Sequence, residues 1–167
     1  RGLLAFQPEH RRFFFGRQKE TKEIADDLQM LRDKKMPRFL IVAGASGTGK
    51  SSVVLAGVVP RLLTVHPQLV FLRMRPGSDP DRALNEALAP CPAGRPALLV
   101  VDQFEEIFTQ TEAPAARDAF VRRLWSLASA AEPGLSVIIT LRVDFIGRCG
   151  ELTVNAAGRR LDRVAYD

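Results

Sequence analysis

The sequence predicts a three-layer α/β sandwich, in which helices cover both faces of a parallel sheet. Short, nearly continuous apolar runs are typical of strands buried on both faces, and here they alternate with longer amphipathic segments. Strands that alternate with helices indicate parallel β-α-β units. The chain has 167 residues, of which 46% are hydrophobic and 26% are charged, so it is large enough to bury one globular core.

The predicted elements follow one another in a regular order. Ile24, Leu28 and Leu31 recur at helical spacing among charged residues, which predicts an amphipathic helix. The apolar run after Pro37 predicts a buried strand. The predicted strands are residues 38–43, 69–73, 97–101 and 135–141, and the predicted helices are residues 19–34, 50–63, a short segment ending at 88, 114–131 and a weak 144–151.

The charge and cysteine content argue against several classes of protein. The net charge is +5, with nineteen arginines and five lysines, but the arginines are scattered rather than clustered. We interpret them as solvated faces, with nucleic acid as the less favoured partner. Cys91 and Cys149 have neither metal-ligand nor disulfide spacing. With no apolar stretch long enough to cross a membrane and no signal peptide in residues 1–10, we expect a cytoplasmic protein without membrane contact.

One glycine-rich segment carries the strongest chemical signal. It matches the phosphate-binding pattern G-x4-G-K-[ST] directly after a predicted buried strand and at the start of a helix. Its residues are Gly44, Ala45, Ser46, Gly47, Thr48, Gly49, Lys50 and Ser51, followed by Ser52. Backbone N–H groups and the helix N-terminus would bind the phosphates, Lys50 would reach the β- and γ-phosphates, and the Ser51 hydroxyl would ligate Mg²⁺.

A second group of polar residues follows the strand at residues 97–101. Asp102 comes directly after four apolar residues, where a carboxylate can complete a magnesium site, and is therefore predicted to be the Walker B acid. Glu105 and Glu106 follow within a turn. We expect one of them to orient and deprotonate the attacking water, and the other to complement a helix N-terminus. The sequence does not separate the two.

Two further sets of residues are candidates for the nucleotide site. Thr140 and Arg142 lie on the same side of the fourth predicted strand, near the γ-phosphate if this strand lies between the other two motif-bearing strands. We interpret them as a polar sensor pair, with a surface role for Arg142 as the alternative. Residues 13–15 are three phenylalanines before a Gly-Arg turn, and they would either wall an adenine pocket or cap the sheet edge.

These residues together resemble the STAND class of P-loop NTPases, most closely the bacterial novel-STAND group that often precedes WD40 or other repeats. The resemblance covers residues 3–148, and the segments Val100–Phe108 and Ile138–Phe145 narrow it beyond a general NTPase. It implies ATP and Mg²⁺ as cofactors, with Gly16 and Arg17 at the nucleotide-base end and Arg142 as the sensor. It also implies a slow ATPase in a signalling or defence switch that forms a homo-oligomer on activation.

The resemblance also implies parts that the pattern of this sequence does not contain. Additional-strand NTPases of this kind order their sheet 5-1-4-3-2 and carry a lid after the fifth strand, whereas only four strands are predicted here. We therefore expect residues 1–148 to be the NTPase core and residues 149–167 to be the incomplete end of the domain. The lid and repeat domains would be partners supplied by other segments.

Three alternatives stay open on the sequence alone. The first is a DNA-linked ATPase of the origin-recognition or helicase-loader type, which shares the Gly-Arg turn and the phosphate loop. The second is a small-molecule kinase, which is disfavoured because no lid arginines or acceptor pocket are recognisable. The third is a nucleotide-binding scaffold without catalytic activity. No guanine-reading segment is visible, and the choice between ATP and GTP is not determined.

Overall fold

The sheet is parallel and has four strands among the residues that the computed structural model describes, which are 18–44, 49–131, 134–154 and 161. The strands are β1 (Phe39–Gly44), β2 (Val70–Met74), β3 (Ala97–Val101) and β4 (Leu135–Arg142). Their order is β1-β4-β3-β2, and all three pairings are parallel. The predicted three-layer α/β fold is therefore confirmed, and β4 lies between the two strands that carry the motifs.

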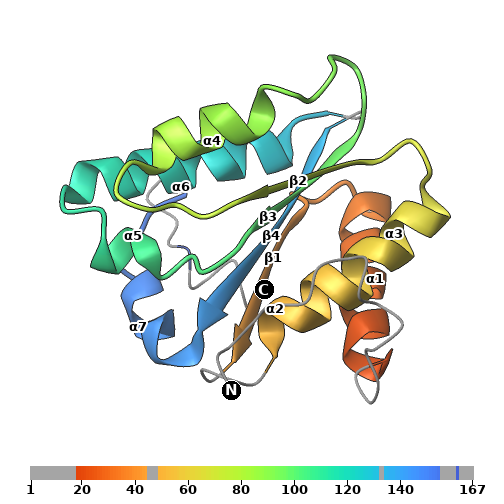
Figure 1. Ribbon diagram of the computed structural model, residues 1–167, viewed down its shortest axis with the longest axis horizontal. Helices are drawn as coiled ribbons and strands as arrows, with labels where there is room; N and C mark the ends of the chain where they lie inside the picture. Colours follow the sequence, from red (N-terminus) through yellow and green to blue (C-terminus); the bar gives the residue numbers. More distant parts are fainter. Residues whose placement is uncertain (1–17, 45–48, 132–133, 155–160, 162–167) are drawn as a thin grey trace.

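Helices cover both faces of this sheet (Figure 1). One face carries α1 (Gln18–Asp33), α2 (Lys50–Ser52), the π-helix η2 (Val53–Val58) and α3 (Val59–Val65). The other carries α4 (Pro80–Leu88), α5 (Glu106–Thr109), α6 (Pro114–Ser129) and α7 (Ile146–Cys149), with the 3-10 turn η3 (Val143–Phe145) before α7. Of the helices that the structure describes, none combines the length and the apolar character needed to cross a membrane.

The two faces of the central strands bury separate cores. Along β3, Leu98 and Val100 pack against α1 and η2, while Leu99 and Val101 pack toward α4 and α6. All five residues of β3 are buried. This double burial explains why the strand is apolar throughout rather than alternating.

The helix after the phosphate loop departs from the prediction in its middle. The sequence predicts one helix over residues 50–63, and the chain is helical from Lys50 to Val65, but η2 is a π-helix. The Val59 N–H donates to the Val54 carbonyl, five residues back. Pro60 lacks an N–H, and its ring would clash with a carbonyl four residues earlier in an α-helix. A wider π turn before Pro60 avoids that clash while keeping the segment helical.

A close approach between α1 and η2 requires a glycine at position 57. A Cβ built on Gly57 would overlap the Thr21 hydroxyl and lie 3.1 Å from Cγ2 and 3.3 Å from Cβ of the same side chain. Rotation of the Thr21 side chain leaves its Cβ atom in place, so a tight contact remains in any rotamer.

Replacing Gly57 by alanine should therefore lower the free energy of unfolding by about 1–3 kcal/mol, as over-packing typically does. Chemical denaturation measures it. Gly147→Ala is the matched control, because nothing lies within 4 Å of a Cβ there and the residue is also helical. The control should stay within about 0.5 kcal/mol of the wild type, and a Gly57→Ala loss no larger than the control's would contradict the close packing.

The last residue of α7 and residues after this helix contribute to the core, although their sequence shows no amphipathic pattern. Cys149, Leu152, Val154 and Leu161 are all at most 2% exposed and belong to the core on the α6 side. The Leu161 N–H donates to the Leu152 carbonyl at 2.9 Å. These residues therefore pack with the sheet, and the division of the chain at residue 148 stays a prediction.

Candidate functional site

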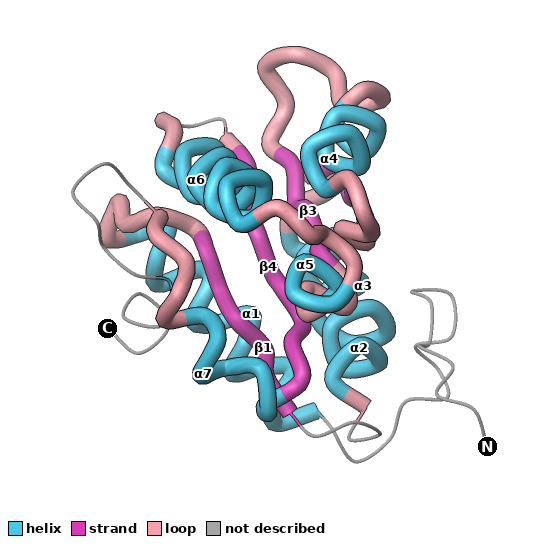
Figure 2. Tube along the Cα trace, turned by 90° about the vertical axis from the view of Figure 1, so that its left-hand side faces the viewer, coloured by secondary structure: helices cyan, strands magenta, loops and turns pink. Residues whose placement is uncertain are grey.

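The predicted motifs meet at the carboxyl ends of β1, β3 and β4, beside the start of α2 (Figure 2). Gly49 caps the helix with φ 78° and ψ 23°, a left-handed conformation that glycine adopts without a steric penalty. Lys50 and Ser51 then form the first turn of the helix, at the end that carries partial positive charge. This geometry is that of an anion-binding helix N-terminus.

The carboxylate of Asp102 is the centre of a buried hydrogen-bond network. Its Oδ1 atom accepts from Ser51 Oγ at 2.7 Å, from Thr140 Oγ1 at 2.7 Å and from the Gln103 N–H at 3.1 Å. Its Oδ2 atom accepts from Arg73 Nη2 at 3.1 Å. The side chain of Asp102 is 2% exposed. Every hydrogen bond to it favours the ionised form.

The network sets the ionisation of Asp102. Burial alone would raise the pKa of this carboxyl, but hydrogen bonds from Ser51, Thr140 and Arg73, together with the charge of Arg73, hold its pKa below the ordinary value of 3.8. Asp102 is therefore a carboxylate at neutral pH. Ser51 and Asp102, predicted from separate motifs, thus place a hydroxyl and a carboxylate oxygen side by side, and such hard oxygens are the ligands that Mg²⁺ prefers.

Glu106 is fully engaged by protein groups. Its Oε2 atom accepts from Nε of Arg75 at 3.1 Å and also from Nη2 of that guanidinium. Its Oε1 atom accepts from the Gly77 N–H at 3.1 Å. The side chain of Glu106 is 8% exposed. Both oxygens therefore have partners in the loop after β2.

Glu105 has a different environment from its neighbour. Its Oε2 atom is buried and has no hydrogen-bond partner among the described residues. Burial raises the pKa of Glu105 above its ordinary value of 4.5, against the opposing effects of the backbone N–H groups of Glu105 and Arg142 and the charges of Lys50 and Arg142. The structure thus separates two glutamates that the sequence does not distinguish.

Arg142 lies opposite Gly44 in the β1–β4 register, at the entrance of the phosphate loop. Its guanidinium binds Asp144, with Nη2 2.8 Å from Oδ2, and lies 5.5 Å from the centre of the Phe145 ring. The side chain is 43% exposed. Thr140 is fully buried against Asp102, so the two predicted sensor residues have different surroundings.

Comparison with known proteins agrees with this geometry. The family model for novel STAND NTPase 1 (nSTAND1) matches residues 1–164. The chain belongs to this family. The match extends beyond residues 3–148, which the sequence resemblance covers. A search of the curated proteins found no match to the chain. Nucleotide binding by a STAND module is thus supported for the chain as a whole.

Some predicted site residues of this novel STAND NTPase lie outside the described residues. They are Gly16, Arg17, Ala45, Ser46, Gly47 and Thr48, together with the phenylalanines at 13–15. Two residues near the site were not predicted, Arg73 and Arg75, at the end of β2 and just after it. Their position at the carboxyl end of a predicted parallel strand could have indicated them, because the carboxyl ends of all parallel strands meet at one edge of the sheet.

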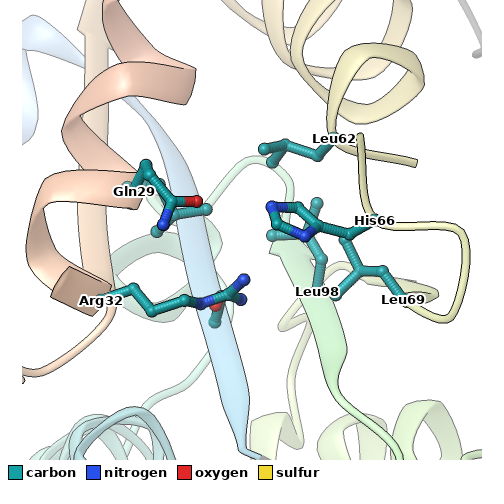
Figure 3. A pocket seen from close by; sticks show the side chains of 8 residues that line it. Gln29, Arg32, Leu62, His66, Leu69 and Leu98 are labelled. Atoms are coloured by element: carbon teal, nitrogen blue, oxygen red, sulfur yellow. The ribbon is translucent and has the colours of Figure 1, made fainter. Parts of the chain in front are cut away.

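A small pocket of this novel STAND NTPase lies away from the nucleotide site (Figure 3). It is lined by Leu28, Gln29, Arg32, Leu62, His66, Leu69, Leu98 and Ser136. Leu98 and Ser136 pair near the amino ends of β3 and β4, whereas Asp102 follows the carboxyl end of β3. The cavity volume is about 10 Å³, enough for a single water molecule. The pocket is therefore separate from the nucleotide site.

Proposed function

We propose that this chain binds ATP with Mg²⁺ and hydrolyses it slowly, as the nucleotide-binding module of a signalling or defence switch. The observation that carries the proposal is the 2.7 Å contact between Ser51 Oγ and Asp102 Oδ1 at the start of α2. It joins the hydroxyl of the phosphate-loop helix to the carboxylate at the end of β3. Family membership supports the nucleotide, and this donor pair supports the metal.

Each binding residue has a distinct task in this proposal. Gly44, Gly49 and the residues between them would bind the phosphates through their backbone N–H groups, and Ser52 lies in the first turn of the helix that follows. Lys50 supplies a fixed positive charge to the β- and γ-phosphates. Ser51 and Asp102 would hold Mg²⁺, which when bound neutralises the phosphate charge. Thr140 keeps the Asp102 carboxylate oriented.

The base in this proposal is Glu105. Its unpartnered buried oxygen is available to accept a proton, whereas both oxygens of Glu106 are occupied. Glu105 takes a proton from a water molecule while the water oxygen bonds to the γ-phosphorus and the bond from that phosphorus to the ADP oxygen breaks. Lys50 and Arg142 lie close enough for their charges to act on Glu105.

The switch itself involves segments other than the described core. Gly16 and Arg17 would contact the base end of the nucleotide, and Arg142 would sense the γ-phosphate. In the sheet of described strands β1 has a neighbour on one side, and a fifth strand followed by a lid would pair on the other. We propose that ATP-dependent closure of that lid leads to a homo-oligomer. Size measurement with ADP and with ATP tests this step.

Replacing Asp102 by asparagine should weaken binding of ATP with Mg²⁺ about 10- to 100-fold, because the carboxylate acts through the ion. Binding of ADP in the presence of a chelator should change less than about threefold. Calorimetry with both ligands measures the difference. Asp27→Asn is the matched control, since it makes the same change of charge on the exposed surface of α1.

Two results would count against the proposal. Equal losses of both ligands would make Asp102 a structural residue. A wild-type protein that binds ATP but shows no turnover of radiolabelled ATP in a single-turnover assay would be a nucleotide-binding scaffold and not an ATPase.

A further inference from the structure

The loop after β2 is fastened to α5 by one buried carboxylate. Glu106 accepts from the Arg75 guanidinium on one oxygen and from the Gly77 N–H on the other. Thr111 strengthens the attachment, because its Oγ1 donates to the Gly77 carbonyl at 2.9 Å. Arg75 also donates from Nη2 to Gln103 Oε1 at 2.6 Å. A single arginine therefore contacts both Gln103 and Glu106 within the turn formed by residues 102–106.

That turn has a backbone conformation that costs free energy. Gln103 has φ 52°, the left-handed region that residues other than glycine seldom adopt. Such residues persist only where surrounding groups hold them. Here the Gln103 N–H donates to Thr140 Oγ1 at 3.0 Å and to Asp102, and Arg75 binds its side chain.

The position of Glu105 depends on this turn. Glu105 is the residue before α5 and lies between Gln103 and Glu106, both of which Arg75 contacts. The backbone N–H groups of Glu105 and Arg142 interact with its carboxyl, while its Oε2 atom makes no hydrogen bond among the described residues. The side chains of Gln103 and Glu106, on either side of Glu105, attach the turn to the loop after β2.

We propose that the ion pair of Arg75 and Glu106 is a latch that holds the 102–106 turn in the conformation required for hydrolysis. Arg75 and Glu106 are then positioning residues, which act through Glu105 and do not touch the reacting atoms. This inference rests on the proposed function, in which Glu105 is the base. Binding of the nucleotide should depend less on the latch, because Asp102 also has three partners outside the turn, Ser51, Thr140 and Arg73.

The latch predicts a loss of turnover without a loss of binding. Misplacing a catalytic group by about 1 Å can cost about 100-fold in rate. Arg75→Met and Glu106→Gln should each lower single-turnover ATP hydrolysis about tenfold or more, with the dissociation constant for ATP and Mg²⁺ within about twofold of the wild type. Glutamine does not substitute for Glu106, since both carboxylate oxygens accept hydrogen bonds and the amide nitrogen would face an N–H group.

A double-mutant cycle and a matched pair of controls separate the latch from a general loss of stability. The double variant, Arg75→Met with Glu106→Gln, should hydrolyse ATP within about twofold of the rate of the slower single variant. The two losses should not add, because both substitutions break the same ion pair. The control pair is Arg82→Met and Glu86→Gln, which breaks an Arg–Glu pair with 77% and 69% exposed side chains on α4. The control variants should hydrolyse ATP at the wild-type rate.

Hydrogen exchange of the nucleotide-free protein gives a readout independent of activity. The amides of residues 103–110 should exchange faster in both latch variants than in the wild type, and should be unchanged in the Arg82 and Glu86 variants. Wild-type turnover in either latch variant, additive losses in the double variant, or unchanged exchange would overturn the latch. If the wild-type protein shows no turnover, the proposed function is overturned, and the catalytic role of the latch with it. The exchange result would still decide whether Arg75 and Glu106 hold the turn.

Discussion

Replacing Lys50 by alanine should abolish detectable nucleotide binding. Lys50 is the first residue of α2, immediately after the left-handed Gly49, and in the proposed site its ammonium group would bind the β- and γ-phosphates. Removing one member of a close charge pair typically costs about 2–5 kcal/mol, or about 30- to 5,000-fold in affinity. The helix N-terminus stays intact in the variant, but its partial charge is worth about 1 kcal/mol or less.

Isothermal calorimetry with ATP and Mg²⁺ measures this loss. Lys22→Ala is the control, because Lys22 is exposed on α1 and the change of net charge is the same. The variant should melt close to the wild-type temperature without nucleotide, and only the wild type should be stabilised when ATP is added. Unchanged affinity in Lys50→Ala would remove the basis for placing phosphates in this loop.

The strands could be predicted from the sequence because both of their faces are buried. Residues 97–101 are apolar throughout, and β3 has these bounds in the structure, since every side chain contacts one of the two cores. The start of α4 is also local in origin. Asp79 caps the helix by accepting from the Arg82 N–H at 3.2 Å, and Pro80 takes the first helical position.

Features that depend on distant contacts could not be predicted in the same way. The π-helix before Pro60 meets α1 at Gly57, and nothing in residues 53–58 alone indicates the wider turn. The burial of Leu152 and Val154 is similar, because the core that covers them is formed by residues far away in the chain. Local pattern carries no information about such packing.

The same distinction between local pattern and distant contacts applies to the candidate site. The spacing of the motifs predicts that Ser51 and Asp102 meet, because each follows a parallel strand at the same edge of the sheet. Two consecutive glutamates, in contrast, have equivalent local patterns. Their surroundings differ because Arg75 comes from another loop and binds Glu106 and not Glu105. The sequence does not show which glutamate such an arginine will reach.

Replacing Glu105 by glutamine should slow single-turnover hydrolysis about 100-fold or more while leaving the affinity for ATP within about twofold, because a positioned base contributes about 10²- to 10⁴-fold to rate. Glu112→Gln is the control, as Glu112 is an exposed glutamate near the end of α5. The same assay on both variants, with binding measured separately, isolates the chemical step. Turnover at the wild-type rate in Glu105→Gln would show that the water is activated by another group.

The pH dependence gives a second, independent test of Glu105. A base acts only when it is deprotonated, so the rate should fall as the pH falls through the pKa of Glu105, which burial raises above 4.5. The charge of Arg142 lowers this pKa, and Arg142→Gln should therefore move the fall in rate to higher pH.

The pH dependence of stability should also reflect the ionisation of Glu105. Since a raised carboxyl pKa means that the folded state binds the proton more tightly, ionisation as the pH rises through that pKa should lower the free energy of unfolding of the wild type relative to Glu105→Gln. A difference in stability that does not change with pH would place Glu105 in water rather than in the buried position from which it acts.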